Sequence, residues 1–335
     1  MAAASNAAEL SVGQLTPLSL FRIIWSIHLE DKPEITTLLE RMAIALEKIA
    51  DLLDVKDLPK IKSDTGDVVS FVSSELEYPT PPANDITKLQ DFLSSRGISI
   101  KTIPPEQESD EILDKIALFI GGRLESVKGV LDSIKTNMNT GRAFSLNLRN
   151  EPHQAVADAT HLCTTLYNIA FLTAYRYQKS PVYQLYATPS TAPRALNFYS
   201  GQWLERFVKT QVVSILKSKS FEFSYVCNAQ ISLPNGDDFE LDMLFETEGV
   251  IFWLEAKTSD YRKHIEKYSK MAKIIGIDCS HMFMVLADGT VTDNLARDLS
   301  SLFGMTVVRI EKFAEQLTKA LPENRDTTIE NEATP

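Results

Sequence analysis

Apolar residues follow a helical spacing up to about residue 193, and a mixture of strand and helix spacing after it. In the first part, apolar positions three and four residues apart repeat over long windows. We expect helices there over 18–29, 33–55, 86–96, 104–138 and 151–177, with one short strand over 98–103. In the second part, short apolar runs of strand length lie between helical patterns. The pattern therefore predicts a mainly α-helical N-terminal region over 15–193 and an α/β domain over 194–321.

Two turn signals set the order of elements in the α/β domain. Asn235-Gly236 lies between two alternating apolar runs, which is typical of a hairpin. A second break at Thr247-Glu248-Gly249 separates the next two runs. Three consecutive antiparallel strands follow from these turns. The expected elements are a helix over 201–216, strands over 224–232, 239–245 and 251–256, a helix over 259–275, a strand over 281–286, a helix over 295–302, a strand over 305–310 and a helix over 311–321.

The expected helix over 33–55 carries a narrow apolar seam. Its residues lie at alternating steps of four and three, as in a heptad repeat. They are Ile35, Leu39, Met42, Leu46, Ile49 and Leu53. Because only about two and a half heptads are present, packing against helices of the same chain is favoured over a free-standing coiled coil. A homodimer formed through this helix is the second interpretation.

Three charged residues interrupt two of the apolar strands. Asp242 lies in the strand over 239–245, which also contains Glu240, Glu255 lies in the strand over 251–256, and Lys257 directly follows that strand. Side chains alternate along a strand, so Glu255 and Lys257 share one face, and a tight hairpin brings Asp242 beside them. Buried charges are costly unless they are paired, and a divalent cation held by two carboxylates would offset that cost. The simpler interpretation is a solvent-facing amphipathic hairpin.

The charges and the element order resemble the PD-(D/E)xK nuclease superfamily, which has a restriction-endonuclease-like αβββαβ core with a mixed sheet. Asp242, Glu255 and Lys257 match the family motif, and Glu205 matches an acid on its first helix. Leu241 stands where the motif has Pro. More narrowly, G-Q-W-L-E at 201–205, E-L-D at 240–242 and L-E-A-K-T at 254–258 are similar to the nuclease domain of CARF-containing CRISPR ancillary effectors. The resemblance covers about residues 198–310, and no CARF domain is evident in front of it.

This resemblance implies a metal-dependent endonuclease acting on DNA, RNA or both, in defence against foreign nucleic acid. Asp242 and Glu255 would hold Mg²⁺ or Mn²⁺, with the Ala256 carbonyl as a further ligand and Glu205 as another, through water. Lys257 would position the attacking water or stabilise charge at phosphorus. The alternative is a catalytically inactive protein that keeps this fold to bind nucleic acid or a protein partner. A sensor in the N-terminal half is a third hypothesis, for which the sequence shows no ligand signature.

Net charge bears on the nucleic-acid hypothesis. The chain has 34 Lys and Arg against 45 Asp and Glu, which argues against a surface coated for nonspecific nucleic-acid binding. A local basic stripe is present on the expected helix over 259–275, where Lys263, Lys267 and Lys270 recur at steps of four and three. We expect it to contact the phosphate backbone, although a solvated helix face is the common alternative. In the tyrosine-rich stretch over 175–186, packing is favoured over base stacking.

The remaining features concern the compartment and the chain ends. The three cysteines show no metal-ligand spacing and are expected to be reduced and buried. The N-terminus lacks the basic and apolar segments of a signal peptide, and no apolar run is long enough to cross a membrane. A cytoplasmic protein without a membrane partner is therefore expected. Residues 1–14, rich in Ala and Ser, are expected to be loose, and the acidic segment 322–335 to be disordered.

Overall fold

The structure is a computed structural model, and it describes residues 85–105, 107, 110–258 and 260–323. The contacts within the chain divide it into two compact units, Met1–Glu77 and Tyr78–Pro335. All of the described residues belong to the second unit. The predicted helical seam over 35–53, the N-terminus over 1–14 and the tail beyond residue 323 lie outside the described residues.

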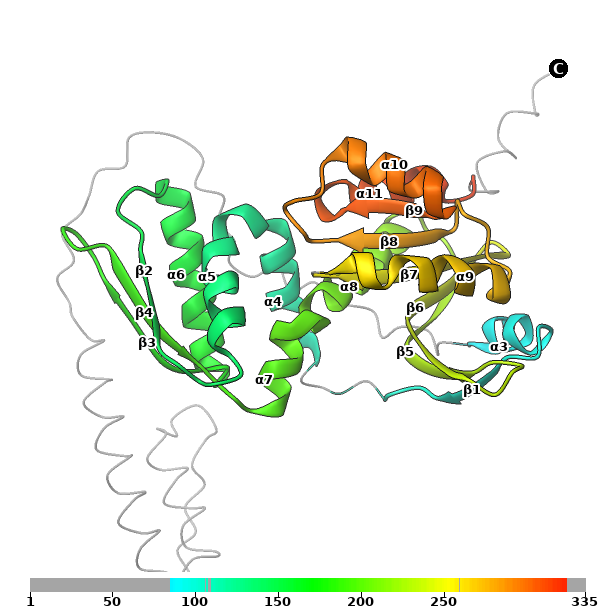
Figure 1. Ribbon diagram of the computed structural model, residues 1–335, viewed down its shortest axis with the longest axis horizontal. Coiled ribbons are helices and arrows are strands. Elements are labelled where there is room, and N and C mark those ends of the chain that lie inside the picture. Colours follow the sequence, from blue (N-terminus) through cyan, green and yellow to red (C-terminus); the bar gives the residue numbers. More distant parts are fainter. Residues whose placement is uncertain (1–84, 106, 108–109, 259, 324–335) are drawn as a thin grey trace, which may run out of the picture. The chain divides into compact units, whose positions relative to one another are not determined.

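A six-stranded mixed sheet forms the centre of the described unit, with the strand order β1-β5-β6-β7-β8-β9 (Figure 1). The first four strands pair antiparallel, and β7, β8 and β9 pair parallel. The α/β class with a mixed sheet is thus as predicted. The strands are β1 (Ser99–Thr102), β5 (Phe223–Ser232), β6 (Asp238–Thr247), β7 (Val250–Lys257), β8 (Met282–Leu286) and β9 (Thr306–Arg309).

Helices cover both faces of this sheet, which explains why β8 is buried along its whole length. One core contains residues of α4, α8 and α11, and the other contains residues of α3, α9 and α10. From α8 to β8 the order is helix, three antiparallel strands, helix and strand, as the sequence pattern predicts, and the last of these strands pairs parallel to β7. The helices are α3 (Thr87–Ser94), α4 (Asp110–Gly122), α8 (Trp203–Ser218), α9 (Ile265–Ile275), α10 (Asp293–Phe303) and α11 (Phe313–Ala320), with 3₁₀ turns at Tyr261–Lys263 and Ile310–Lys312.

A second, three-stranded antiparallel sheet lies within the region expected to be mainly helical. Its order is β2 (Phe144–Asn147), β4 (Gln184–Pro189), β3 (Leu172–Gln178). The helices α5 (Leu124–Asn137) and α6 (His153–Asn168) pack against it (Figure 1). The predicted helix over 151–177 is therefore wrong beyond residue 168. The chain turns at Ala170, whose φ is +59°, and the aromatic residues that follow form a strand because β4 pairs with them.

Two further boundaries differ from the prediction. The strand β1 is an edge strand of the six-stranded sheet, and α3 packs in one of its two cores, although both elements precede the expected domain start at residue 194. A local pattern could not show this, because β1 pairs with β5, more than a hundred residues further along the chain. The helix expected over 104–138 is two helices, α4 and α5, separated by a residue with non-helical backbone angles, Arg123.

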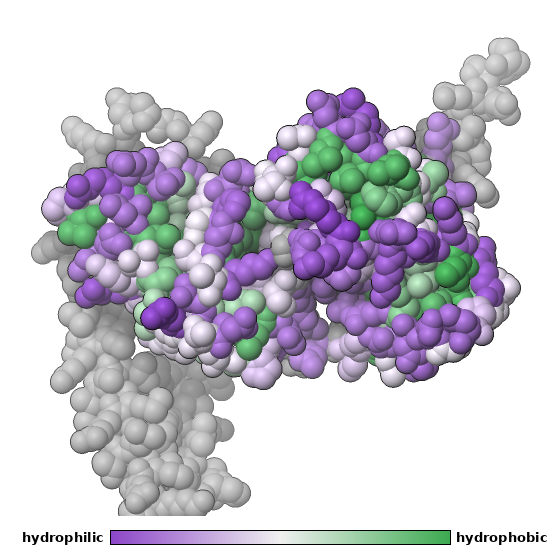
Figure 2. Space-filling model, viewed as in Figure 1, coloured by the Kyte–Doolittle hydropathy of each residue, from purple (hydrophilic) through white to green (hydrophobic). Residues whose placement is uncertain are grey.

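The surface of the described unit is mainly polar. Figure 2 shows a mostly hydrophilic face, with hydrophobic atoms gathered over α10 and α11. In the part of the chain that the structure describes, no helix combines the length and apolarity needed to cross a membrane.

None of the three cysteines forms a disulfide bond. Their expected burial is correct for Cys163, whereas Cys227 is half-buried and Cys279 is exposed.

The packing of α4 against α8 gives a prediction about stability. A Cβ atom placed on Gly121 would lie 2.2 Å from the Phe207 ring of α8, whereas one placed on Gly122 would meet nothing within 4 Å. We expect Gly121→Ala to lower the free energy of unfolding by about 1–3 kcal/mol, because the two helices must move apart. The matched variant Gly122→Ala should be neutral or stabilising by up to about 1 kcal/mol. Urea unfolding followed by circular dichroism measures both, and equal effects would show that this contact is not tight.

Candidate active site

The main-chain pairing of β6 and β7 stops where the two predicted acids face each other. The ladder runs from Thr247 opposite Val250 to Met243 opposite Leu254, so Asp242 and Glu255 form the next pair. Here the side chains replace the carbonyl groups as acceptors. The backbone N–H of Asp242 donates to Glu255 Oε1 at 3.2 Å, and the N–H of Ala256 donates to Asp242 Oδ2 at 2.9 Å. Each carboxylate thus satisfies a backbone donor of the opposite strand, as buried donors require.

Lys257 links the two carboxylates. Its ammonium nitrogen lies 2.9 Å from Asp242 Oδ2 and 3.0 Å from Glu255 Oε2. The same ammonium lies 5.0 Å from the centre of the Tyr268 ring on α9, which is a cation–π distance. The Trp253 indole N–H donates to Glu255 Oε1 at 2.9 Å. The predicted convergence of Asp242, Glu255 and Lys257 is therefore what the structure shows, and the solvent-facing hairpin is not, since Glu255 is 0% exposed.

Both β5 and β6 are irregular next to this point. Residues on one face of a regular strand are two or four apart, yet Val226 and Ala229 lie in the same core, as do Leu241 and Leu244. Asn228 has a φ of +52° and is skipped in the pairing, together with Asp242 opposite it. Asparagine tolerates this left-handed backbone better than most residues. Because the register is the same on both sides of this pair, the irregularity is a local break in the ladder between β5 and β6, and it changes the direction in which their side chains point.

Glu205 reaches the same place from α8. A short helix α7 (Pro193–Asn197) and a π-helical turn over Phe198–Gln202 lead into α8, and Glu205 lies in its first turn. Glu205 accepts a hydrogen bond from the Asn228 side chain. It lines two adjoining cavities, of about 390 Å³ and about 460 Å³. Asp242 lines the first, and Ala256 and Lys257 line the second.

Burial and like charge perturb the acids of this group. Burial, together with the charge of Asp242, raises the pKa of Glu205 to about 7 and that of Glu255 to about 8. Burial alone would lower the pKa of Lys257, but the charges of Glu255 and Asp242 raise it above its usual range. Three carboxyl groups therefore share one ammonium in a mostly buried place. Perturbed titratable groups beside a cavity are typical of functional sites.

The net negative charge of these side chains favours a bound cation, but the number of side chains available as ligands is small. With all groups ionised, three carboxylates and one ammonium leave an excess of two negative charges. Among the described residues, however, no set of three or more acidic, histidine or cysteine side chains is arranged to hold a metal ion. Mg²⁺ commonly uses one or two carboxylates and completes its shell with water and substrate oxygens. Asp242 and Glu255 fit that mode, and Glu205 would act through water.

The predicted lysine stripe does not reach either cavity. Lys263 pairs with Asp260, and Lys270 pairs with Glu266 at 2.8 Å. Lys267 lies 4.7 Å from the centre of the Phe239 ring. The side chains of Lys263 and Lys270 are 74% and 70% exposed. The helix expected over 259–275 begins only at Ile265, so Lys267 and Lys270 lie on α9, whereas Lys263 lies in the 3₁₀ turn before it. The contact of these lysines with nucleic acid stays a prediction.

Two residues that contact the predicted site residues were not predicted from the sequence. Asn228 contacts Glu205, and Tyr268 lies against Lys257. The sequence held no clear signal for Asn228, because β5 also contains the amide Gln230 and the hydroxyl residues Ser224 and Ser232. The motif showed neither residue, because Asn228 and Tyr268 come from β5 and α9, and their neighbourhood depends on how these elements pack.

Comparisons with known proteins add a likeness of fold. Neither the known family models nor the curated proteins include a match to this chain. Among solved structures, Can2 from Sulfobacillus thermosulfidooxidans, in complex with cyclic tetra-adenylate, is similar with a TM-score of 0.50 and 14% identity, over 70% of this chain and 61% of that one. Protein VC1899 from Vibrio cholerae matches with a TM-score of 0.47 and 17% identity, over 69% and 60%. The chain thus spans about 60% of the length of both structures, and the similarity to Can2 is one of fold.

Proposed function

We propose that this protein is a divalent-metal-dependent endonuclease that hydrolyses phosphodiester bonds of DNA, RNA or both. The observation that carries the proposal is the convergence of Asp242 and Glu255 on Lys257, at the point where β6 and β7 separate. Two carboxylates beside one ammonium suit a reaction in which a metal ion and a lysine ammonium both act on a phosphate. We also propose the role in defence against foreign nucleic acid that the motif resemblance implies.

Asp242, Glu255 and the Ala256 carbonyl would hold Mg²⁺ or Mn²⁺. When bound, such an ion lowers the pKa of its water and neutralises phosphate oxygens. The chain prepares the two carboxylates for this, since each is fixed by a backbone N–H of the opposite strand. Trp253 also holds Glu255 in one orientation. Fixed groups need no reorganisation when charge develops.

Lys257 and Glu205 would handle charge and protons. The raised pKa of Lys257 keeps it an ammonium at neutral pH, so it can donate to a phosphate oxygen or to the attacking water. Tyr268 lies against this ammonium and restricts its position. A carboxyl group with a pKa of about 7 can accept a proton near neutral pH, which suits Glu205 as acceptor for a proton of water. Its hydrogen bond with Asn228 orients it for that task.

The fold likeness is in keeping with a ligand of the nucleic-acid type. Can2 was solved in complex with cyclic tetra-adenylate, which is built from nucleotides joined by phosphodiester bonds. Because this chain spans 61% of Can2, the comparison does not place such a ligand on it. The support for a phosphodiester substrate comes from the charges of the site.

A second candidate function is a non-cutting protein that binds nucleic acid or a protein partner with the same fold. The observation favouring it is that the described residues lack a set of three side chains arranged for a metal. Calorimetric titration with Mg²⁺ and Mn²⁺ separates the two candidates. An endonuclease should bind the metal with a heat signal that Asp242→Ala removes, whereas a binding-only protein need show none.

The nuclease proposal predicts the effect of removing either charge. Wild type should cut single- or double-stranded DNA or RNA with Mg²⁺ or Mn²⁺, and chelation should stop the cutting. Asp242→Asn and Lys257→Met should each lower the rate by about 100-fold or more, because each removes a charge acting on the reacting phosphate. Gel assays on labelled oligonucleotides measure this.

Matched variants control for loss of folding and for contamination. Asp238 lies on the same strand as Asp242, and Lys319 is an exposed lysine on α11. Asp238→Asn and Lys319→Met should cut like wild type. Equal cutting by the Asp242 and Lys257 variants, purified identically, would assign the activity to a contaminant and contradict the proposal.

The raised pKa values predict how pH governs metal binding. Metal binding needs deprotonated carboxylates, so stabilisation by Mg²⁺ should grow between about pH 6 and about pH 8.5, through the pKa values near 7 and 8. Without metal, the effect of rising pH on the stability of the folded state has the opposite sign. Both acids have a higher pKa folded than unfolded, so the folded state loses stability as pH rises from about 4.3 towards about 8.

Thermal unfolding with and without Mg²⁺ measures both effects. In Glu255→Gln, the metal-free loss with pH should shrink, because the buried group no longer ionises. Glu222→Gln, which changes an exposed acid, should behave like wild type. A Mg²⁺-induced shift in melting temperature that stays constant across this pH range would contradict the assignment of these acids as ligands.

A further inference from the structure

The three-stranded sheet has a core face and an outer face, because side chains alternate along each of its strands. The core face carries the apolar side chains that pack with α5 and α6, among them Leu146, Leu185 and Tyr175. The intervening residues form the outer sheet face, and the pairing of the strands places them in two rows. One row is Ser145, Tyr186 and Arg176, and the other is Asn147, Gln184 and Gln178.

A tyrosine and an arginine form the planar centre of the outer sheet face. The Arg176 guanidinium lies over the Tyr186 ring, 4.7 Å from its centre, and Tyr186 is 37% exposed. Tyr175 and Tyr177, the chain neighbours of Arg176, instead pack against the core. The packing expected for the tyrosine-rich stretch is thus found for these two residues, whereas the Tyr186 ring is open to a ligand. Nucleic-acid bases stack on aromatic rings and on guanidinium planes.

The outer sheet face carries positive charge without acidic residues. Neither the strands β2, β3 and β4 nor the loop over 179–183 contains an aspartate or a glutamate, whereas Arg176 lies on β3 and Lys179 begins the loop. Within the described residues, neither of these two bases is paired with an acid. Arg149, which follows β2, adds a third positive charge, and it donates to the Pro181 carbonyl at 2.6 Å. This bond holds the loop beside the end of β2.

The charge of this segment contrasts with that of the whole chain. Residues 139–192 contain four bases and two acids, whereas the chain has a net charge of -11. One of the two acids, Asp158, is buried and bound by Arg123 at 2.7 Å, so Glu151 is the one exposed acid of the segment. A locally positive surface on an acidic protein favours a polyanion as its partner.

Amide side chains complete the outer sheet face. Gln178, Gln184 and Asn147 form its second row, and each amide can both donate and accept hydrogen bonds. Such groups bind the edges of unpaired bases. In a duplex the bases are paired and stacked on one another, so planar and amide groups on an open sheet suit a single strand better.

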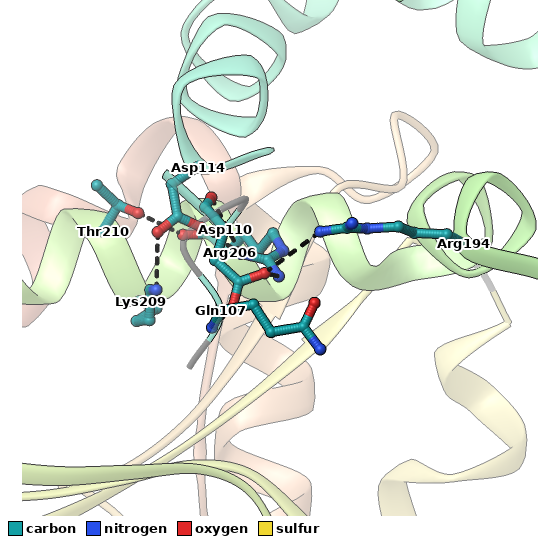
Figure 3. A network of polar contacts seen from close by, with 7 residues as sticks. All are labelled: Gln107, Asp110, Asp114, Arg194, Arg206, Lys209 and Thr210. Atoms are coloured by element: carbon teal, nitrogen blue, oxygen red, sulfur yellow. Dashed lines mark hydrogen bonds and ion pairs between the residues drawn. The ribbon is translucent and has the colours of Figure 1, made fainter. Parts of the chain in front are cut away.

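Another concentration of bases in the described unit is balanced by acids. On α7 and α8, Arg194, Arg206 and Lys209 gather around Asp110 and Asp114 of α4 (Figure 3). Arg206 lies 2.7 Å from each of the two acids, and Lys209 lies 2.7 Å from Asp114. These pairs join α4 to α8, and they leave little net charge for a polyanion.

We infer that the outer sheet face binds single-stranded nucleic acid, with bases stacked on Tyr186 and Arg176 and phosphates beside Lys179 and Arg149. The inference goes beyond the proposed function, because it concerns a surface outside the candidate active site and does not require cutting. In a nuclease this surface would hold the strand that is cut. In a protein that does not cut, it would be the nucleic-acid contact itself.

Binding measured without cutting tests the inference. Fluorescence anisotropy of labelled single-stranded DNA and RNA oligonucleotides with the full chain, in a chelator and over a range of salt concentrations, gives the Kd and its salt dependence. We expect Tyr186→Ala to raise the Kd about tenfold, because a stacked base loses its partner. Lys179→Ala should reduce the slope of log Kd against log salt by about 0.7, as for one phosphate of a single strand. Duplexes of the same sequences should bind more weakly.

Two exposed residues outside this face serve as matched controls. Tyr167→Ala changes a tyrosine of α6 that is 48% exposed, and Lys319→Ala changes an exposed lysine of α11. Both variants should keep the wild-type Kd and salt slope. The tenfold effect of Tyr186→Ala should also persist in a Lys257→Met background, which keeps binding at the candidate active site apart from binding on the sheet.

The outcomes separate this inference from the proposed function. A wild-type Kd in Tyr186→Ala and a wild-type salt slope in Lys179→Ala, at unchanged melting temperatures, would overturn the inference even if the protein cuts. If Tyr186→Ala lowers the melting temperature, Arg176→Ala and Lys179→Ala decide, and wild-type binding by both would overturn it. Binding that depends on Tyr186, in a protein that no metal makes cut, would support the inference and refute the nuclease alone.

A protein partner on the same face is the remaining outcome. A wild type that binds no single-stranded oligonucleotide would overturn the inference. Sedimentation that shows a dimer, together with its dissociation in Tyr186→Ala, would then assign the outer sheet face to a second copy of the chain.

Discussion

The separation of β6 from β7 is the constraint on which the rest of the site depends. A ladder that stops inside a buried sheet leaves backbone N–H groups without acceptors, and such groups are costly. The carboxylates of Asp242 and Glu255 remove that cost by accepting from the opposite strand. These acids therefore have a structural role in addition to the chemical role proposed for them. A neutral side chain without an acceptor at either position would leave a buried donor unsatisfied, besides removing a charge.

The same arrangement concentrates negative charge. Burial raises the pKa values of Glu205 and Glu255, and the repulsion from the charge of Asp242 raises them further. Neighbouring side chains reduce this electrostatic repulsion without removing it: Asn228 binds Glu205, Trp253 binds Glu255, and Tyr268 lies against Lys257. An unfavourable charge that the fold retains has a physical explanation if a divalent cation binds there, because the cation turns the repulsion into attraction.

How far the sequence predicts this structure depends on whether the signal is local. The Asn235-Gly236 turn and the break at 247–249 are local, and they place the hairpins and hence the pairing of Asp242 with Glu255. The strand β1 has no such signal, since its partner is distant in sequence, and the aromatic run after residue 172 fits a helix until β4 pairs with it. The motif likewise contains Glu205 but not Asn228, because the left-handed backbone of Asn228 and the break in the ladder between β5 and β6 depend on packing on both sides of the strand.

The helix α8 connects the two halves of the candidate site. Successive residues of an α-helix point about 100° apart, so Glu205 and Arg206 face different neighbours. Glu205 meets Asn228 of β5, and Arg206 meets Asp110 and Asp114 of α4. The close approach of Gly121 to the Phe207 ring holds α4 at a fixed distance from this helix. A displacement of α4 would therefore change the ion pairs of Arg206 and, through the same turn of α8, the position of the carboxyl group beside Asp242. The packing of α4 against α8 is thus part of what positions Glu205.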